Sequence, residues 1–291
     1  MTRAASVPTE LRDVLEDLCR HYDRRFLDSD PVGIVRRFDD PGDREVVGLI
    51  AAGLAYGRVA SIRASLESLL ARMGGKPSRF VASFDPRQDA RRLDGFVHRF
   101  TRGRDVALLC HLVRQARERA GSLESFFIEG DPDGTSPTLA SALDAFGRRL
   151  FDLQAAPFVP EGGIPRSDGA RWLLPLPHAG SACKRSCLFL RWMVRPDDGV
   201  DCGVWTRVSR ARLVLPLDTH LFRVVRALGW TRRKSSGWAT ALDATARLRA
   251  LDPADPIRFD FALSRLGILG LIPAPGGRLT ARTVRRALAV R

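Results

Sequence analysis

The chain contains 291 residues, of which 45% are hydrophobic and 27% charged, and it carries a formal net charge of +14. This composition is that of a globular protein with one large or two modest domains, and it excludes disordered, collagenous and low-complexity proteins. The five cysteines show no disulfide spacing, which predicts reduced thiols. The chain has no apolar run near the ~20 residues of a membrane span, and Met1 to Glu10 do not resemble a signal peptide. We therefore expect a soluble cytoplasmic protein.

Helical periodicity dominates the first half of the chain, and the alternation typical of strands is scarce. After an amphipathic segment near residues 8–20, one helix opens at Asp43 and is interrupted by a tight loop at Tyr56-Gly57-Arg58. A second helix follows and ends before Gly74. Further amphipathic segments lie near residues 87–99, 105–119, 122–128 and 138–154. These patterns predict an all-α protein.

The second half begins with a long exposed connection at residues 155–171, which is rich in Pro and Gly. A Pro-rich turn at residues 174–180 then leads into a helix from about Ser181 to Val194. After a loop rich in Asp and Gly, a short apolar run at residues 213–217 precedes Asp218 and another helix. Helices near residues 238–250 and 256–267 and a basic tail near 279–290 complete the predicted fold.

The positive charge is concentrated in the last quarter of the chain. Residues 221–291 carry 14 basic and four acidic side chains, which is +10 of the net charge. This distribution is typical of a protein that binds a polyanion such as nucleic acid, the alternative being an arginine-rich surface that contacts only water. Arginine supplies 44 of the 47 basic residues, so the three lysines are positions to inspect: Lys76, Lys184 and Lys234.

Lys184 lies beside the apolar face of its predicted helix, between the buried and the solvent-exposed positions. Partial desolvation, the adjacent Arg185 and the nearby helix N-terminus are each expected to favour a neutral amine, which is a nucleophile. The alternative is a boundary lysine that extends its ammonium group into solvent.

Asp218 stands immediately before an amphipathic helix, where an aspartate most often caps the helix N-terminus. Capping and chemistry are compatible, because a carboxylate held by backbone N–H groups stays ionised and can stabilise a cationic transition state. Position alone favours the capping role.

The surroundings of these two residues resemble those of a known enzyme superfamily. Residues 215–224, Leu-Pro-Leu-Asp-Thr-His-Leu-Phe-Arg-Val, are similar to the motif in which the helix-hairpin-helix base-excision DNA glycosylases carry their catalytic aspartate. Residues 180–190 resemble the hairpin-to-helix junction that carries the Schiff-base lysine of the bifunctional members, and residues 45–73 resemble the paired helices that begin the six-helix barrel. The spacing of 34 positions from Lys184 to Asp218 makes the archaeal-type 8-oxoguanine glycosylases and a related uncharacterised bacterial family the nearest resemblance.

The sequence departs from the superfamily pattern at several positions. His178 replaces the first glycine of the hairpin, and Lys184 follows Gly180 by four residues instead of two. No cysteine occurs after Cys202, so the Cys-rich loop that holds an iron–sulfur cluster in the endonuclease III branch is missing. Because the remaining cysteines do not match a zinc-site spacing either, we expect neither a cluster, a metal nor another cofactor.

The resemblance implies an enzyme that removes a damaged base from double-stranded DNA, with an oxidised purine, 8-oxoguanine above all, as the substrate. Asp218 would stabilise the oxocarbenium-like sugar, and Lys184 would attack C1′ and form the Schiff base through which an AP lyase cleaves the strand. Residues expected at the gap beside the extruded base are Tyr56, Gly57 and Arg58. Those expected around the Asp218 helix and its phosphate contacts are His220, Arg223, Arg226, Arg232, Arg233 and Lys234. Those expected in the base pocket are Asp260 and Phe261, for which the alternatives are a surface charge and a core residue.

The resemblance also implies two helical lobes with the active site in the cleft between them. The six-helix barrel and hairpin would span residues 38–199, and residues 1–37 and 200–291 would form the second lobe. We expect a monomer that associates with the nucleoid. Two other functions are open: a helix-hairpin-helix DNA-binding protein without catalysis, and an arginine-rich RNA-binding protein. The use of lysine at position 184 weighs against the first, since arginine suits a phosphate contact and only a primary amine forms a Schiff base.

Overall fold

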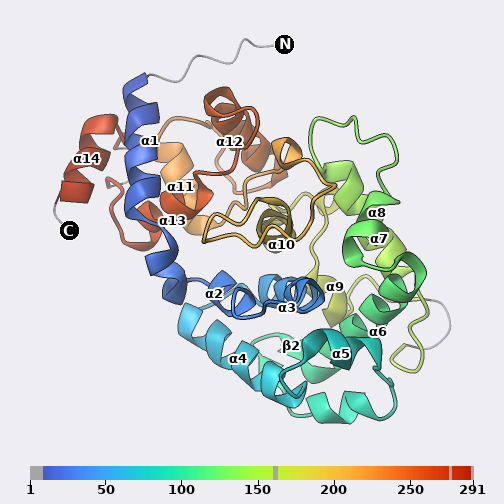
Figure 1. Ribbon diagram of the computed structural model, residues 1–291. Coiled ribbons are helices and arrows are strands. Elements are labelled where there is room, and N and C mark those ends of the chain that lie inside the picture. The colour runs from blue at the N-terminus through green and yellow to red at the C-terminus, as the bar shows by residue number, and fades with distance from the viewer. Residues whose placement is uncertain (1–8, 160–162, 275–276, 290–291) are drawn as a thin grey trace.

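The computed structural model describes residues 9–159, 163–274 and 277–289, and most of these residues are helical (Figure 1). The α-helices are α1 (Thr9–His21), α2 (Val32–Val35), α3 (Pro41–Gly53), α4 (Val59–Arg72), α5 (Pro77–Ala82), α6 (Gly103–Ala120), α7 (Leu123–Ile128), α8 (Ala140–Phe151), α9 (Gly169–Leu173), α10 (Lys184–Val194), α11 (Thr219–Ala227), α12 (Trp238–Leu251), α13 (Asp260–Ile268) and α14 (Ala281–Ala289). Four 3-10 turns and one two-stranded hairpin complete the described elements: η1 (Arg24–Ser29), η2 (Asp89–Leu93), η3 (Pro177–Ala179), η4 (Arg210–Arg212), β1 (Val97–His98) and β2 (Thr101–Arg102).

The two ends of the chain pack together. Helix α1 contacts α13 and α14, and α11 contacts α13, so that these helices lie at one end of the molecule in Figure 1. Helices α3 to α9 occupy the opposite end, and α10 packs against α3. The first residues of α10 and α11 therefore lie where the two groups of helices meet.

The all-α prediction is confirmed, and the predicted helices match the observed ones except near residues 87–99. That segment forms the turn η2 and the start of the β1–β2 hairpin instead of a helix. Gly95 and Arg99 have φ values of +74° and +54°, which place the backbone in the left-handed region and prevent a continuous helix. The predicted connection at 155–171 ends in α9. Its residues 160–162, and residue 290 of the predicted basic tail, lie outside the described part of the chain.

A buried network of ion pairs joins α10 to the loop that follows it and to α13. Arg191, whose side chain is 3% exposed, contacts Asp201 at 3.2 Å and Asp260 at 2.5 Å. Arg195 extends the network from Asp201 to Asp255, which lies 3.0 Å from its Nε atom. Burial raises the pKa of Asp260 to about 6, because loss of hydration outweighs the attraction of Arg191. Asp260 is thus an internal partner of α10 and not the surface charge of the alternative interpretation, while its contact with an extruded base stays a prediction.

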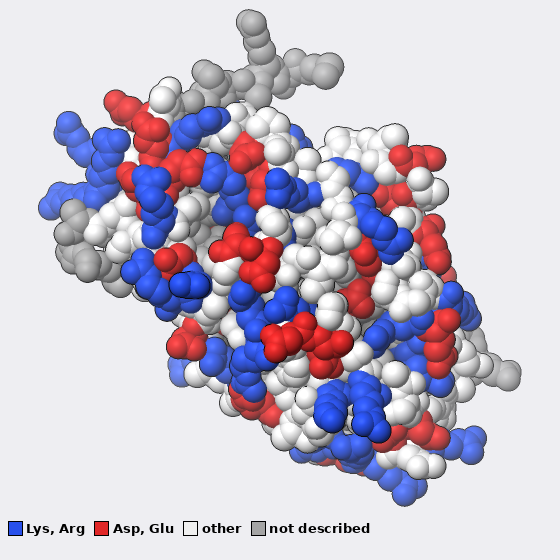
Figure 2. Space-filling view, in the orientation of Figure 1, with Lys and Arg blue, Asp and Glu red and all other residues white. Residues whose placement is uncertain are grey.

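Acidic and basic side chains are interspersed over the face of the molecule that Figure 2 shows, and most of the basic groups there have acidic neighbours. Within the part of the chain that the structure describes, no helix is both long and apolar enough to cross a membrane. The face in Figure 2 also includes α14, where Arg282, Arg285 and Arg286 are exposed.

Candidate active site

Lys184 and Asp218 meet although they are 34 positions apart in the chain. The Nζ atom of Lys184 lies 3.4 Å from Oδ2 of Asp218, and the two side chains are 33% and 24% exposed. Both groups are therefore partly desolvated and still open to a ligand. A primary amine and a carboxylate in this arrangement can act together on an electrophilic carbon, the amine as nucleophile and the carboxylate as the stabiliser of positive charge.

The position of Lys184 is set by the turn before α10. The turn η3 ends at Gly180, whose φ of +75° reverses the chain, and the N-cap residue Cys183 also adopts a left-handed conformation with φ +49°. A non-glycine residue pays about 1–2 kcal/mol for that conformation, so the surrounding contacts must hold it. The Trp238 N–H group donates a hydrogen bond of 3.2 Å to the Gly180 carbonyl, which attaches this turn to the start of α12. Lys184 is then the first residue of α10.

Asp218 is the N-cap of α11, and its two carboxylate oxygens have different partners. Oδ1 accepts a hydrogen bond of 2.8 Å from the Leu221 N–H group, while Oδ2 faces Lys184. The capping role expected from the sequence is confirmed, and it leaves one oxygen available to the site. Because Leu221 and Val224 are buried on the inner face of α11, the helix that carries Asp218 is fixed in the core.

The loop between α3 and α4 reaches the same place. The amine of Lys184 donates a hydrogen bond of 3.3 Å to the carbonyl of Ala55, at the start of this loop. The next residue, Tyr56, is half-buried, and its hydroxyl donates to the His98 carbonyl at 2.9 Å and shares a hydrogen bond with Thr101 Oγ1 at 2.7 Å. The β1–β2 hairpin therefore holds the ring of Tyr56 in a fixed orientation near Lys184.

A cluster of aromatic side chains beside Lys184 was not predicted from the sequence. Trp172 of α9 and Phe100 of the β1–β2 turn are 51% and 70% exposed, and both rings lie within 6.5 Å of the Tyr56 ring, centroid to centroid. The guanidinium of Arg185 lies 4.5 Å from the Trp172 ring centroid and 5.3 Å from that of Tyr56. Burial lowers the pKa of Arg185 to about 10. In the sequence, Arg185 was noted only as the neighbour of Lys184. No sequence pattern indicated that Phe100 or Trp172 is exposed.

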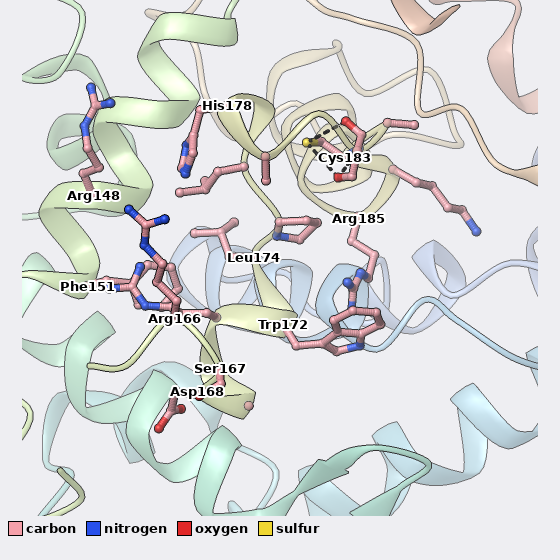
Figure 3. Close-up of a pocket in the computed structure, with 18 of the residues that line it drawn as sticks. Arg148, Phe151, Arg166, Ser167, Asp168, Trp172, Leu174, His178, Cys183 and Arg185 are labelled. Carbon is pink, nitrogen blue, oxygen red and sulfur yellow. Dashed lines mark hydrogen bonds between the residues drawn. The ribbon is translucent and has the colours of Figure 1, made fainter. Parts of the chain in front are cut away.

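These residues border a large groove, called here the α8 groove. It has a volume of about 1420 Å³ and lies between α8, the loop and helix at residues 166–174, and the start of α10. Figure 3 shows Arg148 and Arg166 on the side of α8, with Arg185 extended over Trp172 on the other side. Lys184 belongs to the lining of the groove, and Asp218 does not.

The comparisons with known proteins give one match. A family model described as "Protein of unknown function (DUF2400)" matches residues 30–269. The chain belongs to this family. The searches of curated proteins and of solved structures found no match. The matched region begins after α1 and ends before α14, and it includes Lys184, Asp218 and the whole α8 groove.

The other predicted site residues of this DUF2400 protein lie at different depths. Gly57 and Arg58 are exposed at the tip of the α3–α4 loop, where Gly57 has a φ of +95°. His220 is exposed on the first turn of α11, and its Nδ1 atom lies 3.3 Å from the Gly267 carbonyl. Phe261 is buried, and the guanidinium of Arg265 lies 3.9 Å from its ring centroid. Phe261 is therefore packed in the core, as the alternative interpretation expects, and its stacking on an extruded base stays a prediction.

Two groups can be distinguished among the basic residues after position 220. Arg265 is buried and pairs with Asp30, and Arg258 pairs with Glu16 and with Asp252, so these two arginines hold the fold together. The predicted phosphate-contact residues, in contrast, are exposed on or after α11: Arg223, Arg226, Arg232, Arg233 and Lys234. Arg233 among them lies 2.9 Å from Asp243.

The five cysteines are free, and all but Cys19 are buried. Burial raises the pKa of Cys183 to about 11, which keeps this neighbour of Lys184 in the thiol form at neutral pH. In the described ranges, no group of three or more His, Cys, Asp or Glu side chains is arranged to hold a metal ion.

Proposed function

We propose that this DUF2400 protein is a base-excision DNA glycosylase with an associated AP lyase activity, which removes an oxidised purine, 8-oxoguanine above all, from double-stranded DNA. The observation that carries the proposal is the 3.4 Å contact between Lys184 Nζ and Asp218 Oδ2. Lys184 and Asp218 come from two short motifs, and each motif separately resembles a catalytic segment of the helix-hairpin-helix glycosylases.

The contact supports a division of roles between the two side chains. As the bond from the sugar to the damaged base breaks, the Asp218 carboxylate stabilises the positive charge on the sugar. The neutral Lys184 amine bonds to C1′, and ring opening with loss of a proton gives the Schiff base. Removal of a proton from C2′ then expels the phosphate on the 3′ side, which cleaves the strand. The base must first leave the duplex, at a cost of a few kcal/mol that damage lowers.

The two-lobed glycosylase architecture belongs to the same proposal. The packing of α1 against α13 and α14 supports a second lobe built from both ends of the chain, residues 1–37 and 200–291. The packing of α3 against α10 supports a barrel lobe at 38–199. In this proposal, Lys184 comes from the first lobe and Asp218 from the second, and DNA lies across the cleft.

The proposal is tested by borohydride trapping of the wild-type protein on blunt duplexes that contain 8-oxoguanine, uracil or an abasic site. We expect a covalent protein–DNA adduct with the abasic duplex and with the 8-oxoguanine duplex, because both lead to a reducible Schiff base at C1′. An undamaged duplex of the same sequence is the control. Absence of an adduct with every substrate would exclude the lyase reaction, and base release from uracil alone would replace 8-oxoguanine as the substrate.

Asp218→Asn is expected to slow base release by about 10²–10³-fold, because the variant loses the negative charge that faces the sugar. Asparagine caps a helix as well as aspartate, so the stability of α11 should be retained. Single-turnover release of 8-oxoguanine and the thermal unfolding temperature measure the two properties separately. Full activity in Asp218→Asn would reduce Asp218 to a capping residue and remove it from the mechanism.

Binding to duplex DNA is expected to weaken as salt rises, because exposed arginines replace counterions at the phosphates. Each lost phosphate contact reduces the slope of log K against log salt by about 0.9, so Arg232→Ala combined with Lys234→Ala should reduce it by about 1.8. Arg20→Ala on α1, where the side chain is 71% exposed, is the matched control. An unchanged slope in the double variant would remove this surface from the DNA interface.

A further inference from the structure

The α8 groove is larger than a site for one base requires. Its volume of about 1420 Å³ exceeds the ~300–1,000 Å³ of pockets that enclose a drug-sized ligand. Lys184 is part of its lining, and Asp218 is not. A ligand that fills the groove therefore contacts the Lys184 side chain and extends beyond the Lys184–Asp218 pair.

The charge of the groove favours an anion. Arg148 and Arg166 are exposed at its edge on the side of α8, and Lys184 and Arg185 are part of its lining at the start of α10 (Figure 3). Among the described residues that line the groove, the single carboxylate is that of Asp168, which is only 7% exposed. It is neutralised by Arg104 at 2.7 Å and accepts a hydrogen bond of 2.9 Å from the Ala170 N–H group at the start of α9.

The opposite side of the groove offers flat apolar surfaces. Phe100 and Trp172 are among the most exposed large hydrophobic side chains of the described residues, at 70% and 51%, and their ring centroids are 6.4 Å apart. Proteins bind single strands without base pairing through exposed aromatic rings beside a cationic groove, because every base can stack and every phosphate can pair with a cation.

We propose that the α8 groove binds unpaired nucleotides of a DNA strand, with a base stacked on Trp172 or on Phe100, whose rings are inclined at 79°, and with phosphates bound by Arg148 and Arg166. The inference rests on the proposed function for its biological role, since the strand that enters the groove is the one continuous with the nucleotide at Lys184. Aromatic and cationic side chains on facing sides of one groove match the alternation of base and phosphate in such a strand.

The test is the binding of a fluorescein-labelled oligodeoxythymidylate of about ten residues, followed by anisotropy, with an oligouridylate of equal length as the comparison. We expect Trp172→Ala to weaken binding by about tenfold and Trp172→Phe to restore most of the affinity, because phenylalanine keeps a face for stacking. The double variant Arg148→Ala, Arg166→Ala should reduce the salt slope by about 1.4, which is ~0.7 for each phosphate contact on a single strand. Arg20→Ala is again the control and should bind like the wild type.

Wild-type affinity in both Trp172→Ala and the double arginine variant would overturn the inference. Equal or tighter binding of the oligouridylate would also overturn it, because the groove would then not be a DNA site. Borohydride trapping of the wild type on a blunt abasic duplex decides the glycosylase proposal separately. A protein that binds oligodeoxythymidylate through Trp172 and gives no adduct would lose the proposed activity and keep the groove.

Discussion

Replacing Lys184 by glutamine is expected to abolish the covalent adduct that borohydride traps between the protein and an abasic duplex. Schiff-base formation needs a primary amine, and glutamine supplies a side chain of similar length without one. Lys184 is also the lysine that contacts Asp218, at 3.4 Å. The measurement is the fraction of labelled DNA that migrates with the protein on a denaturing gel after reduction.

The chain supplies its own matched controls, because it contains only two other lysines, Lys76 and Lys234, and both are exposed. Lys76→Gln should trap DNA at the wild-type level, and Lys234→Gln should do so at a protein concentration that saturates the duplex, because Lys234 is expected to contact only a phosphate. An adduct that persists in Lys184→Gln and disappears in one of the others would move the nucleophile to that lysine. Retained duplex binding with no adduct in any variant or in the wild type would favour a DNA-binding protein without catalysis.

Arg191→Met is expected to lower the free energy of unfolding by about 3–5 kcal/mol, the usual loss when one partner of a buried ion pair is removed. Arg191 lies between Asp201 and Asp260, and all three side chains are less than 5% exposed. Methionine has a similar length but leaves the two carboxylates without their shared cation. Urea unfolding followed by circular dichroism gives the difference in free energy.

The matched control is Arg37→Met, which removes an arginine from a surface ion pair with Glu67, where the side chains are 51% and 49% exposed. Exposed pairs contribute about 0–1 kcal/mol, so this variant should unfold close to the wild type. Equal stability of Arg191→Met and Arg37→Met would show that the interior network does not stabilise the fold. A buried ion network does not stabilise the fold where well-packed apolar side chains can replace the complete network without loss of stability.

The sequence was sufficient to predict most of the longer helices, because helix periodicity and capping are local properties. Lys184 and Asp218 were singled out together only through the resemblance to the glycosylase motifs. The distance between Lys184 and Asp218 could not be predicted, since it depends on how α10 packs on α3 and α11 on α13. The same limit explains why the buried ion pair of Asp260 was not predicted, since its partner Arg191 lies 69 residues earlier in the chain. Phe100 and Trp172 were missed because a turn and a five-residue helix have no periodicity that separates exposed from buried aromatics.

The two oxygens of Asp218 have a consequence for protein engineering. Oδ1 stabilises α11, and Oδ2 faces Lys184, so one side chain serves the fold and the candidate site together. A substitution that removes the carboxyl group, such as Asp218→Ala, changes both at once and cannot assign a loss of activity to either. Asp218→Asn separates the two, because the amide keeps the helix cap and removes the negative charge. Directed evolution that selects for thermal resistance alone therefore meets no barrier to replacing the carboxylate by its amide.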